Sequence, residues 1–213
     1  MLTLSSIDKF DEKIFRQTME TILAFSNAIS ARDKYTSRHS HLVANFAYHI
    51  ARQLGISSKE IQLLYWASML HDVGKIGISE DILNKKENLT VEESQIIRQH
   101  TVIGVKILEP LDSIKEIIPI IYHHHERFDG TGYPDRLKGR EIPLLSRIIA
   151  VADAFEAMTS ERSYRNKMQP EIALSNIKLS SGTQFDPKIV KCFEDIYKKG
   201  NKLSTILPIE YLI

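Results

Sequence analysis

The sequence predicts a single all-α domain, and three observations support this. Apolar residues recur at helical spacing through most of the 213 residues. Two segments carry the pattern of a helix N-terminal capping box, Ser57 with Glu60 and Thr90 with Glu93. No segment shows the alternation of polar and apolar residues that is typical of a half-buried strand, and we find no internal repeat or low-complexity segment.

Each helix is predicted from its own pattern. The first carries Ile14, Ile22 and Ile29 at helical spacing, and the second ends at Gly55. The two capping boxes begin the third and fourth helices, and apolar periodicity indicates the rest. The expected ranges are 10–31, 39–54, 57–70, 91–108, 111–123, 144–159, 170–179 and 187–198. Between 124 and 143, Gly, Pro and charged residues interrupt the pattern, which predicts a long surface loop.

The composition excludes several classes of protein. With 28 basic and 27 acidic residues the net charge is +1, so long-range attraction to polymeric nucleic acid or to an anionic membrane is not expected. The single cysteine, Cys192, excludes an intramolecular disulfide and a cysteine-rich metal site. No apolar run approaches the roughly 18 residues of a membrane span, and no signal-like segment opens the sequence. We therefore expect a cytoplasmic protein.

Several of the eight histidines fall on helix faces that should be buried. His39 precedes Leu42 by one turn and lies in line with Phe46, on the apolar stripe of its helix. His100 falls among Ile96 and Ile103, again on an inward face. A lone inward histidine is usually a hydrogen-bonded core imidazole, so none of these positions alone predicts a site.

Two carboxylates change that interpretation. Asp153 is flanked by Ile149 and Ala157 on a predicted helix, and His71 and Asp72 end an apolar run. Burying a carboxylate without a partner is costly, whereas a cation rewards buried nitrogen and oxygen ligands together. Imidazoles mixed with carboxylates suit iron, manganese, zinc or cobalt. The set exceeds what one ion needs, and Asp72 could bridge two ions about 3.5–4 Å apart.

The sequence also resembles a known family. The doublet in "MLHDVGKIGI", followed by "HHERFDGTGYP", is similar to the HD-GYP family, a branch of the HD phosphohydrolase superfamily that hydrolyses cyclic di-GMP. The resemblance runs from about Asp33 to Phe193 and includes "ILNKKENLT", "LKGREIPLLSRIIAVADAFEAMTSERSYR" and "FDP". It implies an HD-type helical bundle over residues 33–199, with a metal centre in its core and a long GYP loop. Residues 1–32 would form a helix packing on this domain, and residues 200–213 an apolar tail.

Carried over position by position, the resemblance implies seven metal ligands: His39, His71, Asp72, His100, His124, His125 and Asp153. His123 matches no ligand position, and we expect it to lie beside the site or at the surface. In relatives with three metals, an acidic residue stands four positions before the first histidine. Tyr35 stands there in this chain, so we expect two ions, although Asp33 and Glu156 leave a third open.

The resemblance implies roles for four further residues. Lys75 matches a lysine that contacts phosphate, and we expect Asp72 and Lys75 to be catalytic. Arg162 and Arg165 match basic positions that bind phosphate or guanine. Tyr133, in the Gly-Tyr-Pro triplet, either fixes the shape of the loop or lines the substrate groove.

The expected reaction is hydrolysis of cyclic di-GMP to linear pGpG, and onward to GMP in some cases, by a hydroxide held between two divalent ions, iron or manganese. Two alternatives stay open: an HD-type phosphohydrolase acting on another cyclic dinucleotide or nucleotide, and a catalytically idle metal-containing signalling module. The first helix and the tail "STILPIEYLI" are candidates for docking a second copy or a signalling protein, although packing on the chain's own core is the favoured alternative.

Overall fold

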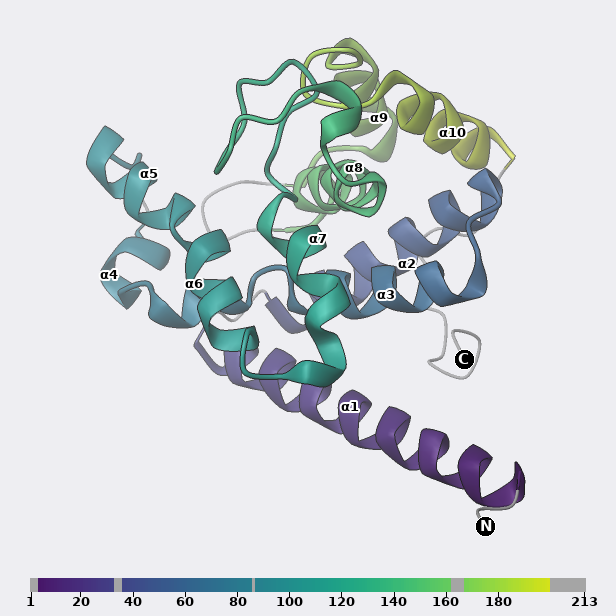
Figure 1. Cartoon of the computed structure of the whole chain (residues 1–213). Helices are drawn as coiled ribbons and strands as arrows, with labels where there is room; N and C mark the ends of the chain where they lie inside the picture. Colours follow the sequence, from purple (N-terminus) through teal and green to yellow (C-terminus); the bar gives the residue numbers. More distant parts are fainter. Residues whose placement is uncertain (1–3, 33–35, 86, 162–166, 200–213) are drawn as a thin grey trace.

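The computed structural model describes residues 4–32, 36–85, 87–161 and 167–199 (Figure 1). Its centre is formed by α2 (Thr36–Leu54), α3 (Ser58–Leu70) and α8 (Leu144–Thr159), with α2 packed against both of the others. The remaining elements are α1 (Leu4–Arg32), η1 (Val73–Gly77), α4 (Glu80–Leu83), α5 (Val91–Arg98), α6 (His100–Leu108), η2 (Asp112–Ile117), α7 (Ile118–Tyr122), η3 (Gly139–Glu141), α9 (Pro170–Leu179) and α10 (Pro187–Lys198). The described part of the chain contains no strand, only an isolated bridge between Ser181 and Phe185. The predicted all-α class is confirmed.

Both predicted capping boxes are present, at Ser57 with Glu60 and at Thr90 with Glu93. Two segments that were predicted to be continuous helices are each divided into two elements. The segment 91–108 is broken at Gln99, whose N–H donates to the Ile96 carbonyl three residues back. The segment 111–123 is a 3-10 helix followed by the short α7, which has a proline in its first turn. Proline cannot donate the backbone hydrogen bond that would continue the preceding turn.

The core of the domain is a layer of aromatic and aliphatic side chains between α2, α8 and α10. Phe155 on α8 meets Phe46 of α2 edge-on at 5.2 Å between ring centroids, and Phe193 of α10 at 4.9 Å. Asp186 caps α10 by accepting from the Lys188 N–H, and it also pairs with Arg147 at 2.5 Å. The face of α8 that carries Phe155 therefore packs into the core, and polar side chains of α8 can lie on another face.

The long helix α1 crosses one side of the domain (Figure 1) and packs on α2, α3, η1 and η2. Ile22 and Ile29 of this helix are fully buried, and Trp66 of α3 donates to the Met19 sulfur at 3.0 Å. The predicted boundary between residues 32 and 33 stays a prediction, and the tail at 200–213 lies outside the described residues. No helix that the structure describes has the length and apolar character needed to cross a membrane.

Gly74 lets η1 and α6 approach closely. A Cβ atom on Gly74 would lie 1.8 Å from the His100 carbonyl oxygen and 2.6 Å from the Gly104 nitrogen. No side chain larger than hydrogen fits between these backbones. The contact matters because Asp72 immediately precedes η1 and His100 begins α6.

We predict that Gly74→Ala destabilises the fold by about 3 kcal/mol, at the upper end of overpacking costs, because the clash is with backbone atoms that cannot rotate away. Urea unfolding followed by circular dichroism would measure the change. Ser58→Ala, at an exposed position in the first turn of α3, is the control and should change stability by less than about 0.5 kcal/mol. Equal stability of the two variants would contradict the close packing of η1 on α6.

Candidate metal centre

The structure brings the seven predicted ligand residues together from five places in the chain. They come from α2, the end of α3, the start of α6, the turn after α7, and α8. Their side chains form three overlapping groups whose nitrogen or oxygen atoms all lie within 4.8 Å of one another. These groups are His39 with His71 and Asp153, His71 with Asp72 and His124, and His100 with His124 and His125.

Asp72 stands between two sets of histidines. Its Oδ2 atom lies 3.6 Å from His39 Nε2 and 3.4 Å from His71 Nε2. Its Oδ1 atom lies 3.7 Å from His100 Nε2 on the other side. Each oxygen of the carboxylate thus faces a different group of imidazoles, which is the arrangement a bridging carboxylate needs.

Three of the imidazoles are held by the helix turn that precedes them. His71, His100 and His124 each place Nδ1 within 2.6–2.7 Å of the carbonyl three residues earlier, those of Ser68, Ile97 and Ile121. A carbonyl can only accept, so Nδ1 carries the proton and Nε2 keeps its lone pair. All three lone pairs point into the cluster.

His39 is oriented by a carboxylate instead. Its Nδ1 atom donates to Glu156 Oε2, while Glu156 Oε1 accepts from the Ser160 hydroxyl at 2.5 Å. Glu156 is 2% exposed and lies three residues after Asp153 on α8. Both Glu156 oxygens therefore accept a hydrogen bond, one from His39 and one from Ser160. This is the carboxylate–histidine support that often stands behind a metal-binding imidazole.

Burial and charge set the protonation of the cluster. Burial lowers the pKa of the His100 and His124 imidazoles and, with the neighbouring His100, lowers that of His125 to about 3. Burial opposes ionisation of Asp72, but Lys75 and the surrounding histidines hold the pKa of that carboxyl well below its usual value. At neutral pH His100, His124 and His125 are therefore neutral and Asp72 is ionised, which are the protonation states of metal ligands.

The donor set fits divalent cations. His39 Nε2 and His71 Nε2 lie 3.2 Å apart, and His39 Nε2 lies 3.4 Å from Asp153 Oδ1. Two ligands each about 2.1 Å from one ion are separated by roughly 3.0–3.4 Å at angles between 90° and 109°. Because Nδ1 of each ring donates to Glu156 or to the Ser68 carbonyl, the two facing Nε2 atoms both present lone pairs, and neither can donate to the other. Cations would satisfy both the facing lone pairs and the buried carboxylates.

One side of the cluster is open. His71, His100 and His124 are each 1% exposed, whereas the side chains of Asp153 and Lys75 are 21% and 24% exposed. Lys75 Nζ lies 2.7 Å from Asp72 Oδ2. The predicted catalytic lysine thus sits at the entrance, in contact with the carboxylate at the centre.

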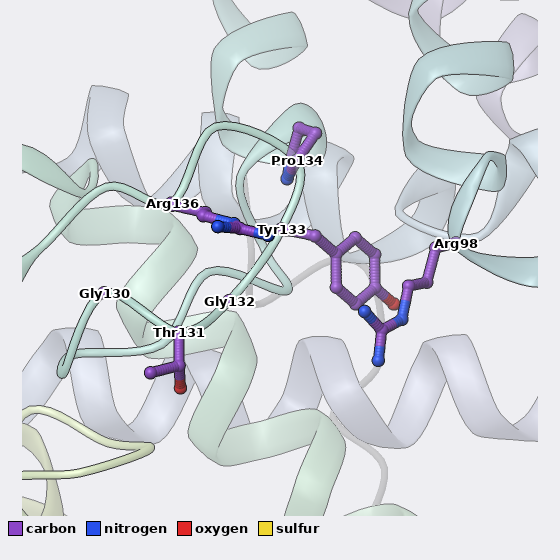
Figure 2. A pocket seen from close by; sticks show the side chains of 7 residues that line it. All are labelled: Arg98, Gly130, Thr131, Gly132, Tyr133, Pro134 and Arg136. Atoms are coloured by element: carbon purple, nitrogen blue, oxygen red, sulfur yellow. The ribbon is translucent and has the colours of Figure 1, made fainter. Parts of the chain in front are cut away.

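The loop at 124–143 forms the rim of this entrance. Glu126, 3% exposed, accepts from the Asp135 N–H through Oε1 at 2.7 Å and so ties the loop back on itself. A Cβ atom on Gly132 would lie 2.3 Å from the Arg127 nitrogen, so only glycine fits where these two segments of the loop pack together. The Tyr133–Pro134 peptide bond is cis. Tyr133 stacks on His125 with centroids 4.9 Å apart and also lines a pocket, which is shown in Figure 2.

The remaining predicted positions lie either beside the cluster or outside the described residues. His123 bonds the Pro119 carbonyl through Nδ1 and Asp135 through Nε2 at 3.1 Å, so it lies beside the cluster. Arg162, Arg165, Tyr35 and Asp33 lie outside the described residues. The supporting roles of Glu156 and Glu126 were not predicted. For Glu156 a signal existed, since an acid three residues after Asp153 shares its helix face.

Comparisons with known proteins agree on the family. A model described as "HD domain" matches residues 23–189. A Thermotoga maritima protein named "Cyclic di-GMP phosphodiesterase" is 39% identical over 91% of this chain and 54% of its own length. A Vibrio cholerae protein named "3'3'-cGAMP-specific phosphodiesterase 3" is 38% identical over 89% of this chain and 40% of its own. The chain thus spans about half or less of these relatives.

Among solved structures, the chain is similar to the crystal structure of a cyclic GMP-AMP specific phosphodiesterase of V. cholerae. The TM-score is 0.70 at 23% identity, and the match covers 91% of this chain and 51% of that one. This likeness supports the fold.

We predict that Glu156→Gln weakens metal binding by roughly 10–100-fold while the helical fold is retained, because the charge that orients His39 is lost. Titration of metal-free protein with Mn²⁺ against a competing chelator would measure the affinity. Glu109→Gln, at an exposed position just after α6, is the matched control and should leave the affinity unchanged. Equal affinities of the two variants would contradict the supporting role of Glu156.

We also predict that metal-free protein becomes less stable as the pH falls below about 6.5. The folded-state pKa values of His100, His124 and His125 lie below the ordinary value, so the unfolded chain binds more protons in this range. Burial lowers the pKa of His39, but its hydrogen bond to Glu156 and the nearby carboxylates raise it overall, so His39 alone among these four opposes the trend.

Urea unfolding with a chelator at pH 7.5 and pH 5.5 would test this. We expect a lower free energy of unfolding at pH 5.5. An equal or higher value there would mean that the buried imidazoles are not held neutral.

Proposed function

The chain belongs to the HD domain family, and on this premise we propose that it hydrolyses cyclic di-GMP to linear pGpG with the help of divalent cations. The observation that carries the proposal is the position of Asp72, whose two oxygens face separate groups of histidines. Two-ion sites with a bridging carboxylate are typical of enzymes that hydrolyse phosphate esters. The name of the T. maritima relative supports the choice of substrate.

We propose two ions, held by two halves of the cluster. His39, His71 and Asp153 would hold one, and His100, His124 and His125 the other, with Asp72 shared between them. Glu156 supports the count of two, because both of its oxygens are engaged by His39 and Ser160. Imidazole and carboxylate ligands suit iron, manganese, zinc or cobalt, and of these we propose iron or manganese.

When bound, the cations would lower the pKa of a coordinated water and offset the charge that develops on the phosphoryl oxygens. The chain's own residues do the rest. The Lys75 ammonium, at the open side of the cluster, would donate to a non-bridging oxygen of the scissile phosphate. The buried histidines exclude bulk water behind the phosphate, which strengthens these interactions.

A second candidate substrate is 3′3′-cyclic GMP-AMP, because a relative 38% identical to the chain carries that name. The metal cluster would be the same for both substrates, so the choice depends on groups that touch the bases or the second phosphate. Parallel turnover measurements with both cyclic dinucleotides separate the two candidates. A catalytically idle module is disfavoured because the cluster keeps every ligand that the family resemblance requires.

We predict that Asp72→Ala lowers turnover of cyclic di-GMP by more than about 100-fold and reduces bound metal, with the helical fold retained. Loss of a ligand shared by both ions should lower activity more than loss of a residue that only orients a ligand, which lowers metal affinity or activity roughly 10–100-fold. Chromatography of pGpG and elemental analysis would measure both effects. Asp112→Ala, which removes a surface carboxylate paired with the exposed Lys115, is the matched control. Wild-type turnover by Asp72→Ala would refute the assignment.

A further inference from the structure

A pocket lies next to the metal cluster, on the other side of Tyr133 from His125. This pocket of about 350 Å³ is lined by Arg98, Arg136 and the loop residues 130–134. In Figure 2 the arginine side chains lie on opposite sides of Tyr133, Arg98 from the end of α5 and Arg136 from the loop. This volume is at the lower end of the roughly 300–1,000 Å³ of small-molecule sites, so the pocket suits part of a dinucleotide better than the whole.

Tyr133 joins the pocket to the metal cluster. One face of its ring stacks on His125, with an interplanar angle of 27°. The guanidinium carbon of Arg98 lies 5.2 Å from the centroid of the same ring, within the range of a cation–π contact. The Tyr133 ring therefore lies between His125 of the cluster and the Arg98 cation.

Arg136 adopts a backbone conformation that does not suit it. Its φ angle is +57°, and it is the described non-glycine residue with a positive φ. This region is unfavourable for a side chain with a Cβ atom, and glycine would occupy it without cost. Strained residues of this kind often lie at functional sites, where the side chain is required.

Neither pocket arginine is neutralised by a described carboxylate. Arg127, in the same loop, pairs with Asp129 at 3.0 Å, and Asp135 is bonded to His123. No such ion pair is formed by Arg98 or Arg136 with the part of the chain that the structure describes. Two cations at one pocket predict an anionic ligand, and guanidinium groups match the geometry of phosphate oxygens.

We propose that Arg98 and Arg136 bind the second, non-scissile phosphate of a cyclic dinucleotide. The inference rests on the proposed function. A cyclic dinucleotide carries two phosphodiesters joined through one ring, so a molecule with one phosphate at the metal cluster presents the other some distance away. The two arginines offset that second charge and fix the ring over the cluster. They are binding and positioning residues, and they take no part in the chemical step.

The test compares substrates with two phosphates and with one. Arg98→Gln and Arg136→Gly should each raise the KM for cyclic di-GMP at least about tenfold, the effect of losing a charge-assisted hydrogen bond, with little change in kcat. For bis(p-nitrophenyl) phosphate, which has one phosphate, the increase should be at least fivefold smaller. Calorimetry with a slowly hydrolysed phosphorothioate analogue of cyclic di-GMP should show the same loss of affinity.

Matched variants separate charge from backbone effects. Arg136→Lys keeps a cation that can bind phosphate and should retain most of the affinity. Arg136→Gly relieves the positive φ, so its melting temperature should not fall while its KM rises. Arg140→Gln, exposed on the same loop and outside the pocket, should behave as wild type.

The outcomes are distinct. Unchanged KM and affinity in both Arg98→Gln and Arg136→Gly would overturn this inference and leave the proposed function standing. An equal loss in Arg136→Lys and Arg136→Gly would also overturn it, because the cation would not be what the ligand requires. If wild-type protein cleaves bis(p-nitrophenyl) phosphate but neither cleaves nor binds any cyclic dinucleotide, the proposed function fails and this inference fails with it.

Discussion

The packing of Asp72 and Asp153 among imidazoles, with Asp72 buried and Asp153 partly buried, is the constraint on which the rest of this structure depends. Asp72 is 3% exposed, and Asp153 lies beside it among histidines whose pKa values are mostly lowered by burial. Uncompensated charges in such a setting would be strongly destabilising. Lys75 reaches only one side of Asp72, through Oδ2. The arrangement becomes favourable when cations occupy the space between the nitrogen and oxygen atoms, so metal binding and folding should be coupled.

The fold meets this constraint by placing the ligands at helix ends. His71, His100 and His124 all lie at a terminus, where each ring bonds a carbonyl three residues earlier. Carbonyls in the last turn of a helix lack an intrahelical partner, so the ring nitrogen satisfies them and is oriented in return. Close packing of η1 on α6 at Gly74 then brings Asp72 beside His100. In each case one hydrogen bond orients the imidazole ring and also satisfies a carbonyl at the end of a helix.

Much of this architecture could be predicted from the sequence. Apolar periodicity predicts the larger helices, and inward placement on those helices is enough to identify His39, His100 and Asp153 without the family resemblance. The break at Gln99 could not be predicted, because the apolar pattern continues through it and carries no sign of the hydrogen bond from the Gln99 N–H to the Ile96 carbonyl. Glu126 and Arg136 were missed for a similar reason. Their roles follow from how the loop folds back on itself, which periodicity does not describe.

The central claim is that this cluster holds two cations and hydrolyses a cyclic dinucleotide with them. Anaerobic purification and elemental analysis, followed by incubation of the same sample with cyclic di-GMP and chromatography of the products, test it most directly. The account predicts about two equivalents of iron or manganese per chain, as a two-ion site requires, with pGpG as product. Protein that takes up no metal under any loading condition, or that is loaded with metal and leaves cyclic dinucleotides intact, would contradict it.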